Sequence, residues 1–318
     1  MMKMVILDGH TLNPGDLSFE PLKEFGSLTY YDRTPSQLTA DRIGDAEIVF
    51  TNKTLIDASI MDACPNLKYI GLFSTGYNVV DIRHAAEKGI VVTNIPSYST
   101  DAVAQHVFAL ILALTNRVAE HNARVQAGEW ISSKDFCFYD RLTELAGKTI
   151  GVVGFGRIGQ RVVRIANAFG MPALAYTRTP RPVPEGLDVR LVPFDTLLEE
   201  SDIVSLHCPL FEETRGLMNA EAFAKMKPAA LLINTARGPV VNQADLAQAL
   251  AKGVIAGAGL DVIDVEPMTV DNPLLGVKNC IITPHIAWAA LETRQRLLDT
   301  VIANLKAYLA GAPVNTVQ

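Results

Sequence analysis

The stretch that decides the fold reads Lys148-Thr149-Ile150-Gly151-Val152-Val153-Gly154-Phe155-Gly156-Arg157-Ile158-Gly159-Gln160. Its apolar run predicts a buried strand, and the three glycines after it lead into apolar residues at helical spacing. In such a strand–turn–helix, Gly154 would make the tight turn, Gly156 would admit a pyrophosphate and Gly159 would let the helix pack closely. The stretch therefore predicts a dinucleotide-binding turn, with a tight turn of another α/β protein as the alternative.

Short apolar runs alternate with helical or turn-rich patterns along the 318 residues, which is typical of α/β proteins. The first hundred residues have the pattern of a small α/β unit without a glycine-rich turn, and the second half has that of a doubly wound sheet. We therefore predict an α/β fold with two doubly wound, Rossmann-like domains. The predicted strands are residues 4–7, 28–31, 48–50, 67–72, 90–93, 150–153, 172–176, 189–192, 203–206, 230–234, 255–260 and 280–283.

The last helical pattern, residues 291–310, comes after the last predicted strand and so has no further strand of that sheet to cover. We expect it to belong to the first unit. The predicted domains are a discontinuous substrate-binding domain of residues 1–98 and 289–318, and a dinucleotide-binding domain of residues 99–288.

The composition is that of an ordinary globular chain, with 49% hydrophobic and 19% charged residues. A formal net charge of −6 argues against a nucleic-acid partner, which needs a basic face. The longest apolar run, residues 107–114, is far shorter than the roughly 20 residues that span a bilayer. Because Asp8 interrupts the apolar start at once, we expect no signal peptide, no membrane partner and a cytoplasmic location.

The four cysteines lie far apart and form no C-x-x-C pair. This spacing suggests neither a zinc site nor a disulfide framework. We therefore predict no metal and four buried thiols in a reducing compartment, namely Cys64, Cys137, Cys208 and Cys280.

A long helix is predicted over residues 101–124, with a broad apolar stripe along residues 103–114. This stripe is too apolar for a surface helix. We expect it to be buried in its own domain and also to pack on a second subunit, which predicts a homodimer through the nucleotide domain.

The residues after the second strand of the glycine-turn unit bear on the choice of cofactor. An NAD site places a carboxylate there to bind the ribose 2′-hydroxyl, but this chain has Thr177, Arg178 and Thr179, followed by Arg181. Hydroxyl and guanidinium groups suit a 2′-phosphate, so we predict that NADPH is accepted at least as well as NADH. The alternative is that these are solvated loop charges.

Three polar residues come after predicted strands at the edge where α/β sheets bind ligands, namely Arg237, Glu266 and His285. Each alone could be a solvated or structural residue, but their common placement favours a site. In the first unit, Phe73-Ser74-Thr75-Gly76-Tyr77 comes after a strand and could offer backbone N–H groups to a carboxylate, or could be an ordinary loop.

Four ordered motifs together give the chain a family resemblance. After the glycine turn come Leu231-Leu232-Ile233-Asn234-Thr235-Ala236-Arg237-Gly238, Gly259-Leu260-Asp261-Val262 running to Glu266-Pro267, and Pro284-His285-Ile286-Ala287-Trp288. These resemble the catalytic blocks of the D-isomer-specific 2-hydroxyacid dehydrogenases and cover nearly the whole chain. The chain is most similar to the branch of glycerate dehydrogenases, or hydroxypyruvate (glyoxylate) reductases.

The resemblance implies a formate/glycerate dehydrogenase-like fold with a deep interdomain cleft and a role for each matching residue. Arg237 would bind the substrate carboxylate and carbonyl, His285 would be the general acid and base, and Glu266 would orient His285. Thr75, Gly76 and Trp288 would contact substrate, and Asp261 the nicotinamide amide. The implied cofactor contacts are Gly154, Gly156, Arg157, Ile158, Gly159, Thr177, Arg178, Thr179, His207, Pro209, Thr214, Thr235, Ala236, Asp261, His285 and Ala287.

The expected reaction is reduction of a small 2-oxo acid by NAD(P)H, with hydroxypyruvate and glyoxylate as the first choice. The family's usual acidic residue is replaced by Thr177, and its usual aspartate in the substrate loop by Asn78. Trp288 would favour a short substrate or could be core packing. Alternatives are a longer 2-oxo acid, formate or phosphite as substrate, or a corepressor-like nucleotide sensor. No additional regulatory domain is expected after the final helix.

Overall fold

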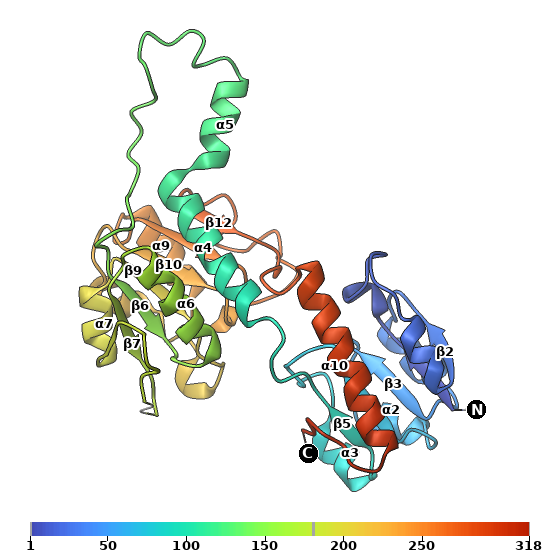
Figure 1. Cartoon of the computed structure of the whole chain (residues 1–318). Helices are drawn as coiled ribbons and strands as arrows, with labels where there is room; N and C mark the ends of the chain where they lie inside the picture. Colours follow the sequence, from blue (N-terminus) through green and yellow to red (C-terminus); the bar gives the residue numbers. More distant parts are fainter. Residues whose placement is uncertain (1, 180–181, 318) are drawn as a thin grey trace. The chain divides into compact units, whose positions relative to one another are not determined.

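The computed structural model describes residues 2–179 and 182–317 and divides into two compact units. Unit 1 consists of Met1–Ser99 and Trp288–Gln318, and unit 2 of Thr100–Ala287. Each unit is built on one parallel sheet (Figure 1). The predicted fold class, two doubly wound α/β domains, is confirmed, and every predicted strand run overlaps an observed strand.

Unit 1 has a five-stranded sheet in the order β2-β1-β3-β4-β5. Its strands and helices are β1 (Lys3–Ile6), β2 (Ser27–Tyr30), α1 (Thr39–Ile43), β3 (Ile48–Thr51), α2 (Ala58–Ala63), β4 (Tyr69–Leu72), α3 (Ile82–Glu87), β5 (Val91–Thr93) and α10 (Leu291–Leu309). The helix α10 buries Leu297, Leu298, Val301 and Leu305 against β1, β3 and β4. Each such side chain stabilises the unit by roughly 1.5–3 kcal/mol on leaving water.

Unit 2 has a seven-stranded sheet in the order β12-β11-β10-β9-β6-β7-β8. Helices α4 and α6 pack on one face, and α7, α8 and α9 on the other. The elements are α4 (Thr100–Asn116), α5 (Val118–Gln126), β6 (Ile150–Val153), α6 (Arg157–Ala168), β7 (Ala173–Tyr176), β8 (Val189–Leu191), α7 (Phe194–Glu200), β9 (Ile203–Leu206), α8 (Ala220–Lys225), β10 (Leu231–Asn234), α9 (Gln243–Ala251), β11 (Gly257–Leu260) and β12 (Cys280–Ile282).

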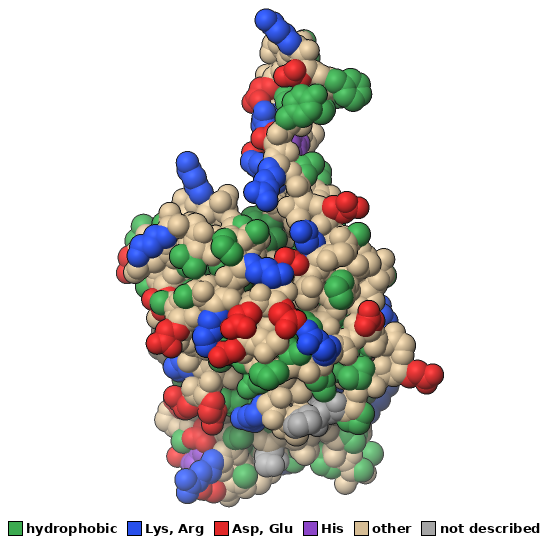
Figure 2. All heavy atoms as spheres, turned by 90° about the vertical axis from the view of Figure 1, so that its left-hand side faces the viewer, with side chains coloured by type: hydrophobic (Ala, Val, Ile, Leu, Met, Phe, Trp, Pro, Cys, Tyr) green, Lys and Arg blue, Asp and Glu red, His purple; other side chains and the backbone are tan. Residues whose placement is uncertain are grey.

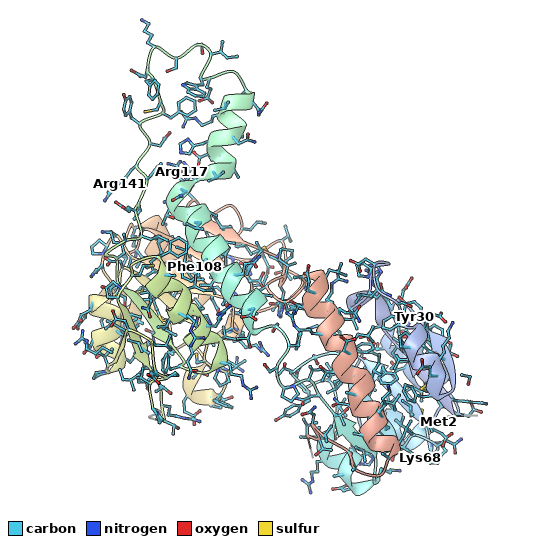
Figure 3. All side chains as sticks on the ribbon, viewed as in Figure 1. Met2, Tyr30, Lys68, Phe108, Arg117 and Arg141 are labelled. Carbon is cyan, nitrogen blue, oxygen red and sulfur yellow. The ribbon has the colours of Figure 1, made fainter. Side chains whose placement is uncertain are left out.

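The predicted helix over residues 101–124 is wrong in one respect, because it is broken into α4 and α5. Arg117 adopts a left-handed backbone conformation with φ 50°, and the two helices meet at a bend of 52°. The apolar stripe ends before this point, so packing against the sheet no longer holds the chain straight. Phe108 lies on α4 (Figure 3), and its ring stacks on that of Phe169 with 5.3 Å between the centroids. Val107, Leu110 and Ile111 of the stripe are buried within the unit.

Helix α5 and residues 127–142 form a projection that we call the arm (Figures 1 and 2). Arg117 and Arg141 lie on its two limbs at the base (Figure 3). Six large apolar side chains of the arm are half or more exposed, namely Val118, Trp130, Ile131, Phe136, Tyr139 and Leu142. The arm thus presents apolar surface that its own unit leaves uncovered.

The prediction of four buried thiols is also wrong in part. Cys64 and Cys208 are buried and Cys280 is half-buried, but Cys137 is exposed because it lies on the arm. All four are free thiols. Among the described residues no single helix is long and apolar enough to cross a membrane, although α4 and α5 would pass as a bent pair on length and composition.

Candidate functional site

The glycine turn between β6 and α6 has the geometry that its three glycines allow. Gly154 has φ 100°, and a Cβ on it would lie 2.7 Å from the backbone of His207 and Cys208. A Cβ on Gly159 would lie 2.3 Å from the Gly154 carbonyl oxygen, so only glycine lets the helix approach its strand this closely.

Gly156 differs from its two neighbours because a Cβ there would meet nothing within 4 Å. It is the N-cap of α6 and has no side chain with which to cap the helix, so it leaves the first N–H groups, those of Arg157, Ile158 and Gly159, without a side-chain cap. Such N–H groups and the positive end of the helix dipole bind phosphate. The residues present at this turn therefore fit a dinucleotide pyrophosphate.

The loop after β7 lies next to the loop after β9. Arg178 places its guanidinium carbon 5.3 Å from the centroid of the Phe211 ring, and Thr177 Oγ1 donates to the Thr179 carbonyl at 3.0 Å. Thr214 Oγ1 donates to the Pro209 carbonyl at 2.8 Å, which closes the second loop. The predicted partner Arg181 lies outside the described residues.

His207 comes after β9, beneath the glycine turn, and is uncharged at neutral pH. Burial lowers the pKa of His207 to about 3. Its Nε2 lies 2.8 Å from Ser205 Oγ, and its backbone N–H donates to the Val153 carbonyl at 2.7 Å. A neutral ring at this position adds no charge beside the predicted phosphate site.

Arg237 lies in a turn immediately after β10, and Asn234 shapes that turn. The buried Asn234 side chain accepts from the Ala236 N–H at 3.0 Å and donates to the Arg237 carbonyl at 2.9 Å. A Cβ on Gly238 would lie 1.9 Å from the Ile263 carbonyl oxygen, so the turn presses against the segment that leads to Glu266. The Arg237 side chain is exposed, and its Nη1 donates to the Ala236 carbonyl at 2.7 Å.

Glu266 and His285 form the pair that the sequence predicts. Glu266 Oε2 lies 2.7 Å from His285 Nδ1, and Glu266 Oε1 accepts from the Ile263 N–H at 3.2 Å. Both side chains are about one-third exposed. Because the carboxylate holds Nδ1, the other ring nitrogen, Nε2, is left to face a substrate.

Asp261 lies where the sequence predicts it, at the end of β11, but it is only 1% exposed. Its carboxylate accepts hydrogen bonds from the Thr283 hydroxyl and from the Ile286 and Ala287 N–H groups. These bonds hold the loop that carries His285. The expected contact with a nicotinamide amide stays a prediction.

Thr235 connects Asn234 to the Arg237 turn, and its Oγ1 is buried without a hydrogen-bond partner among the described residues. A buried hydroxyl of this kind is normally satisfied. This unpaired oxygen lies just after β10, at the same carboxyl ends of the strands as the glycine turn. It is a second observation that fits a cofactor bound there.

In unit 1 the loop after β4 is held by the segment after β5. Thr75 Oγ1 donates to the Ile95 carbonyl at 2.6 Å, and Asn94 Nδ2 donates to the Thr75 carbonyl at 2.7 Å. No acceptor for the backbone N–H groups of Thr75 and Gly76 is found in residues 2–179 or 182–317. Two unpaired N–H groups in a fixed loop can bind a carboxylate.

Trp288 also lies in unit 1, at the start of the segment that leads into α10. Its ring meets Tyr98 edge-on, with 6.5 Å between the centroids and 74° between the planes. It is half-buried and packs on the core beneath α10. This favours core packing, and a substrate contact stays a prediction.

Residues 2–179 and 182–317 contain no group of three or more His, Cys, Asp and Glu side chains that could hold a metal ion. The support that Asn234 and Gly238 give to Arg237 was not predicted from the sequence. An asparagine at a strand end before a glycine is the signal that could have revealed it.

Comparison with known proteins gives consistent matches. Residues 108–287 match the family model described as D-isomer specific 2-hydroxyacid dehydrogenase, NAD binding domain. The chain is 49% identical to the hydroxypyruvate reductase of Blautia hydrogenotrophica, over 99% of both chains, and 38% identical to the glycerate dehydrogenase of Methylorubrum extorquens, again over 99% of both. Its structure resembles that of the NADPH-dependent glyoxylate/hydroxypyruvate reductase from Sinorhizobium meliloti in complex with NADP and malonate, with a TM-score of 0.85, 32% identity and coverage of 99% and 96%.

Proposed function

This chain belongs to the D-isomer-specific 2-hydroxyacid dehydrogenase family, and we propose that it reduces hydroxypyruvate and glyoxylate to D-glycerate and glycolate. Family membership makes it an oxidoreductase that transfers a hydride between NAD(P)H and a small 2-oxo acid. The two named substrates are favoured because relatives that match over almost the full chain bear those activities in their names.

One observation supports the catalytic assignment above all others, which is the 2.7 Å contact of Glu266 with His285 beside the Arg237 turn. The strands that precede these residues are neighbours in register, with Asn234 opposite Leu260 and Leu260 opposite Ile282. The three side chains therefore all follow the carboxyl ends of neighbouring parallel strands in one sheet.

The chemistry arises from the three groups. The guanidinium of Arg237 can hold a planar 2-oxo carboxylate in its fork and polarise the neighbouring carbonyl. His285, held at Nδ1 by Glu266, donates the proton on Nε2 to the carbonyl oxygen as that oxygen gains charge, and takes it back in the oxidative direction. The bound NAD(P)H supplies the hydride. For unit 1 the proposal is separate, namely that the backbone N–H groups of Thr75 and Gly76 bind a carboxylate.

A direct assay tests the proposal. The purified protein should oxidise NADPH or NADH in the presence of hydroxypyruvate or glyoxylate, with kcat/KM at least about tenfold above that for a branched 2-oxo acid. Formate and phosphite are assayed as alternative substrates, with the oxidised cofactors. Turnover of one of these, without turnover of hydroxypyruvate or glyoxylate, would overturn the substrate assignment while leaving the family intact.

The proposed roles of the units are dinucleotide binding by unit 2 and substrate binding by unit 1. The glycine turn supports the first role, and the unpaired N–H groups of Thr75 and Gly76 support the second. A cytoplasmic location remains a prediction.

We propose that the protein accepts NADPH at least as well as NADH. The support is local, because Thr177 and Arg178 occupy the loop after β7 where a carboxylate would exclude a 2′-phosphate. Replacing Arg178 with Ala should lower kcat/KM for NADPH and leave that for NADH nearly unchanged. Arg164→Ala, an exposed arginine on α6, is the matched control. An unchanged cofactor ratio in Arg178→Ala would refute the phosphate contact.

A homodimer through unit 2 is the proposed assembly. The arm exposes Ile131 and Phe136 at 90% and 88%, and a hollow of about 1460 Å³ lies between α4, α5 and the amino ends of the strands. Light scattering should give twice the chain mass, and Ile131→Asp with Phe136→Asp should shift it toward the monomer. Val270→Asp, which alters an equally exposed valine elsewhere in the unit, should not. A monomeric parent at micromolar concentration would contradict the proposal.

A further inference from the structure

One buried carboxylate holds the loop that carries His285. Asp261 Oδ1 accepts from the Thr283 hydroxyl at 2.6 Å and from the Ile286 N–H at 2.9 Å, and Oδ2 accepts from the Ala287 N–H at 2.8 Å. The Asp261 carbonyl accepts from the His285 N–H at 2.9 Å. Asp261 thus accepts from three successive backbone N–H groups, from His285 to Ala287, and shares that of His285 with the Thr283 carbonyl at 2.9 Å.

This support is needed because His285 has φ 56°, in the left-handed region. Such a conformation costs a residue other than glycine about 1–3 kcal/mol and persists only where the surroundings determine it. The hydrogen bonds to Asp261 determine it here. The direction in which the imidazole points toward Glu266 therefore depends on the position and charge of the Asp261 carboxylate.

His106 approaches the Asp261 carboxylate from a separate element, the helix α4. His106, on α4, places its Nε2 2.9 Å from Thr283 Oγ1 and 3.4 Å from Asp261 Oδ1. The Thr283 hydroxyl has one proton, and its 2.6 Å contact with an ionised carboxylate requires that proton between the two oxygens. Thr283 must then accept from His106, so the donors run from His106 to Thr283 to Asp261.

The charge on Asp261 depends on these donors. Burial works to raise the pKa of Asp261, but the hydrogen bonds from His106, Thr283 and the two backbone N–H groups together hold it below its ordinary value. Other charged groups of the surrounding elements are engaged elsewhere: Asp101 of α4 pairs with Arg161 of α6, Arg237 donates to a backbone carbonyl, and Glu266 pairs with His285. Within the described residues, His106 is the one titratable side chain that contacts this carboxylate.

We propose that His106 and Thr283 are positioning residues for the general acid, acting through Asp261 on the loop of His285. Neither touches the pair of Glu266 and His285, and both act by keeping the carboxylate ionised and in place. The inference rests on the proposed role of His285. It also makes α4, the helix from which the arm continues, a mechanical support of the catalytic loop.

The test compares variants that remove a hydrogen bond with variants that keep it. Thr283→Val and His106→Leu should each lower kcat roughly 10- to 100-fold, while KM for the cofactor stays within about twofold, because only the placement of the acid is lost. Thr283→Ser and His106→Gln, which keep an O–H or N–H donor, should retain most of the parent's kcat. Gln105→Leu, on the exposed face of the same helix, is the matched control.

Two further readouts separate positioning from mere stability. The double variant His106→Leu/Thr283→Val should be slower than Thr283→Val by much less than the loss seen in His106→Leu alone, because His106 acts mainly through Thr283 and otherwise only approaches Asp261 Oδ1 at 3.4 Å. In Thr283→Val the pKa of Asp261 should rise, so the acid limb of the pH–kcat profile should move to higher pH.

Additive losses, a Thr283→Ser enzyme as slow as Thr283→Val, or an unshifted acid limb would each overturn the proposal. Should Thr283→Val fail to fold, the pair His106→Leu and His106→Gln carries the same comparison. All rates are taken relative to the parent on whichever 2-oxo acid the parent reduces. Failure of the hydroxypyruvate assignment therefore leaves this test intact.

Discussion

Units 1 and 2 share one topology around their first strand and differ in the residues that come directly after that strand. β1 lies between β2 and β3, and β6 lies between β7 and β9, so in both sheets the strand order reverses at this strand. After β6 comes the glycine turn, with open space above Gly156. After β1 comes Asp8, which is 3% exposed.

The carboxylate of Asp8 occupies the place where a phosphate would need donors. It accepts from the backbone N–H groups of Asn52 at 2.9 Å, Lys53 at 2.6 Å and Thr54 at 2.9 Å, all from the loop after β3. A buried negative charge repels a second anion. The reversal of strand order in a parallel sheet is therefore not enough to bind a nucleotide. In unit 2 the glycines leave space for a phosphate, whereas in unit 1 the Asp8 carboxylate already occupies the backbone N–H donors.

The largest expected effect separates the unit in which we place the general acid from the other unit. His285→Ala should lower kcat by about 10²–10⁴-fold, because it removes the proposed general acid. His84→Ala on α3 of unit 1 removes a histidine that also contacts a carboxylate, that of Asp62 at 2.9 Å, and should leave kcat nearly unchanged. Steady-state kinetics on both variants checks this prediction. A His285→Ala enzyme with the parent's kcat would show that the catalytic site does not lie at His285.

The next effect concerns the glycines that come after β1 and β6, the strands at which the two sheets reverse their order. Gly156→Ala adds a methyl group in open space, so the midpoint of thermal unfolding should not change, but Kd for NADPH should rise at least about tenfold, or roughly 1.4 kcal/mol. Gly9→Ala would place a Cβ 2.2 Å from the Tyr30 ring and should lower stability by about 1–3 kcal/mol without changing Kd. Fluorescence titration measures Kd, and thermal unfolding measures stability. A Gly156→Ala variant that lost stability but bound NADPH normally, or a Gly9→Ala variant that lost only NADPH binding, would contradict this prediction.

Asp8→Asn tests the role of the Asp8 carboxylate in unit 1. An amide has one acceptor oxygen and turns two N–H donors toward a loop that also donates, so we expect a loss of about 1–3 kcal/mol in the free energy of unfolding. Chemical denaturation measures it, with Asp41→Asn on the exposed face of α1 as the control. Tighter binding of NADPH to Asp8→Asn would show that the carboxylate had been suppressing a second nucleotide site.

The smallest effect on rate is expected from Glu266→Gln. Glutamine keeps one acceptor oxygen near His285 Nδ1 and the Ile263 N–H, but it removes the carboxylate that contacts both. kcat should therefore fall by less than in His285→Ala, in which no imidazole remains. Steady-state kinetics measures the loss, and a Glu266→Gln enzyme with the parent's kcat would contradict the proposed pairing.

The parts of the fold that could be predicted are those with a local signal. The twelve strand runs are short, apolar and bounded by turns, and the proposed catalytic residues come soon after such runs. The break at Arg117 could not be predicted, because the helical pattern runs through it and the conformation depends on where packing against the sheet stops.

Support residues were hidden for a different reason. Asp8 bonds to residues more than forty positions away, and His106 reaches Thr283 across most of unit 2. Nothing in the neighbouring sequence marks either contact. Asp261 was found, but its resemblance to a family motif suggested a cofactor contact, whereas its burial and its bonds to the His285 loop became visible only in three dimensions.

The division of unit 1 between the two ends of the chain has a consequence for synthesis on the ribosome. Unit 2 is continuous in sequence and can complete its sheet as soon as it has left the exit tunnel, since domains generally fold as units during synthesis. Unit 1 emerges first but is finished last, because the leucines of α10 complete one side of its core. During translation its β1, β3 and β4 thus wait with an apolar face uncovered, and this nascent segment is the one that would most benefit from a chaperone.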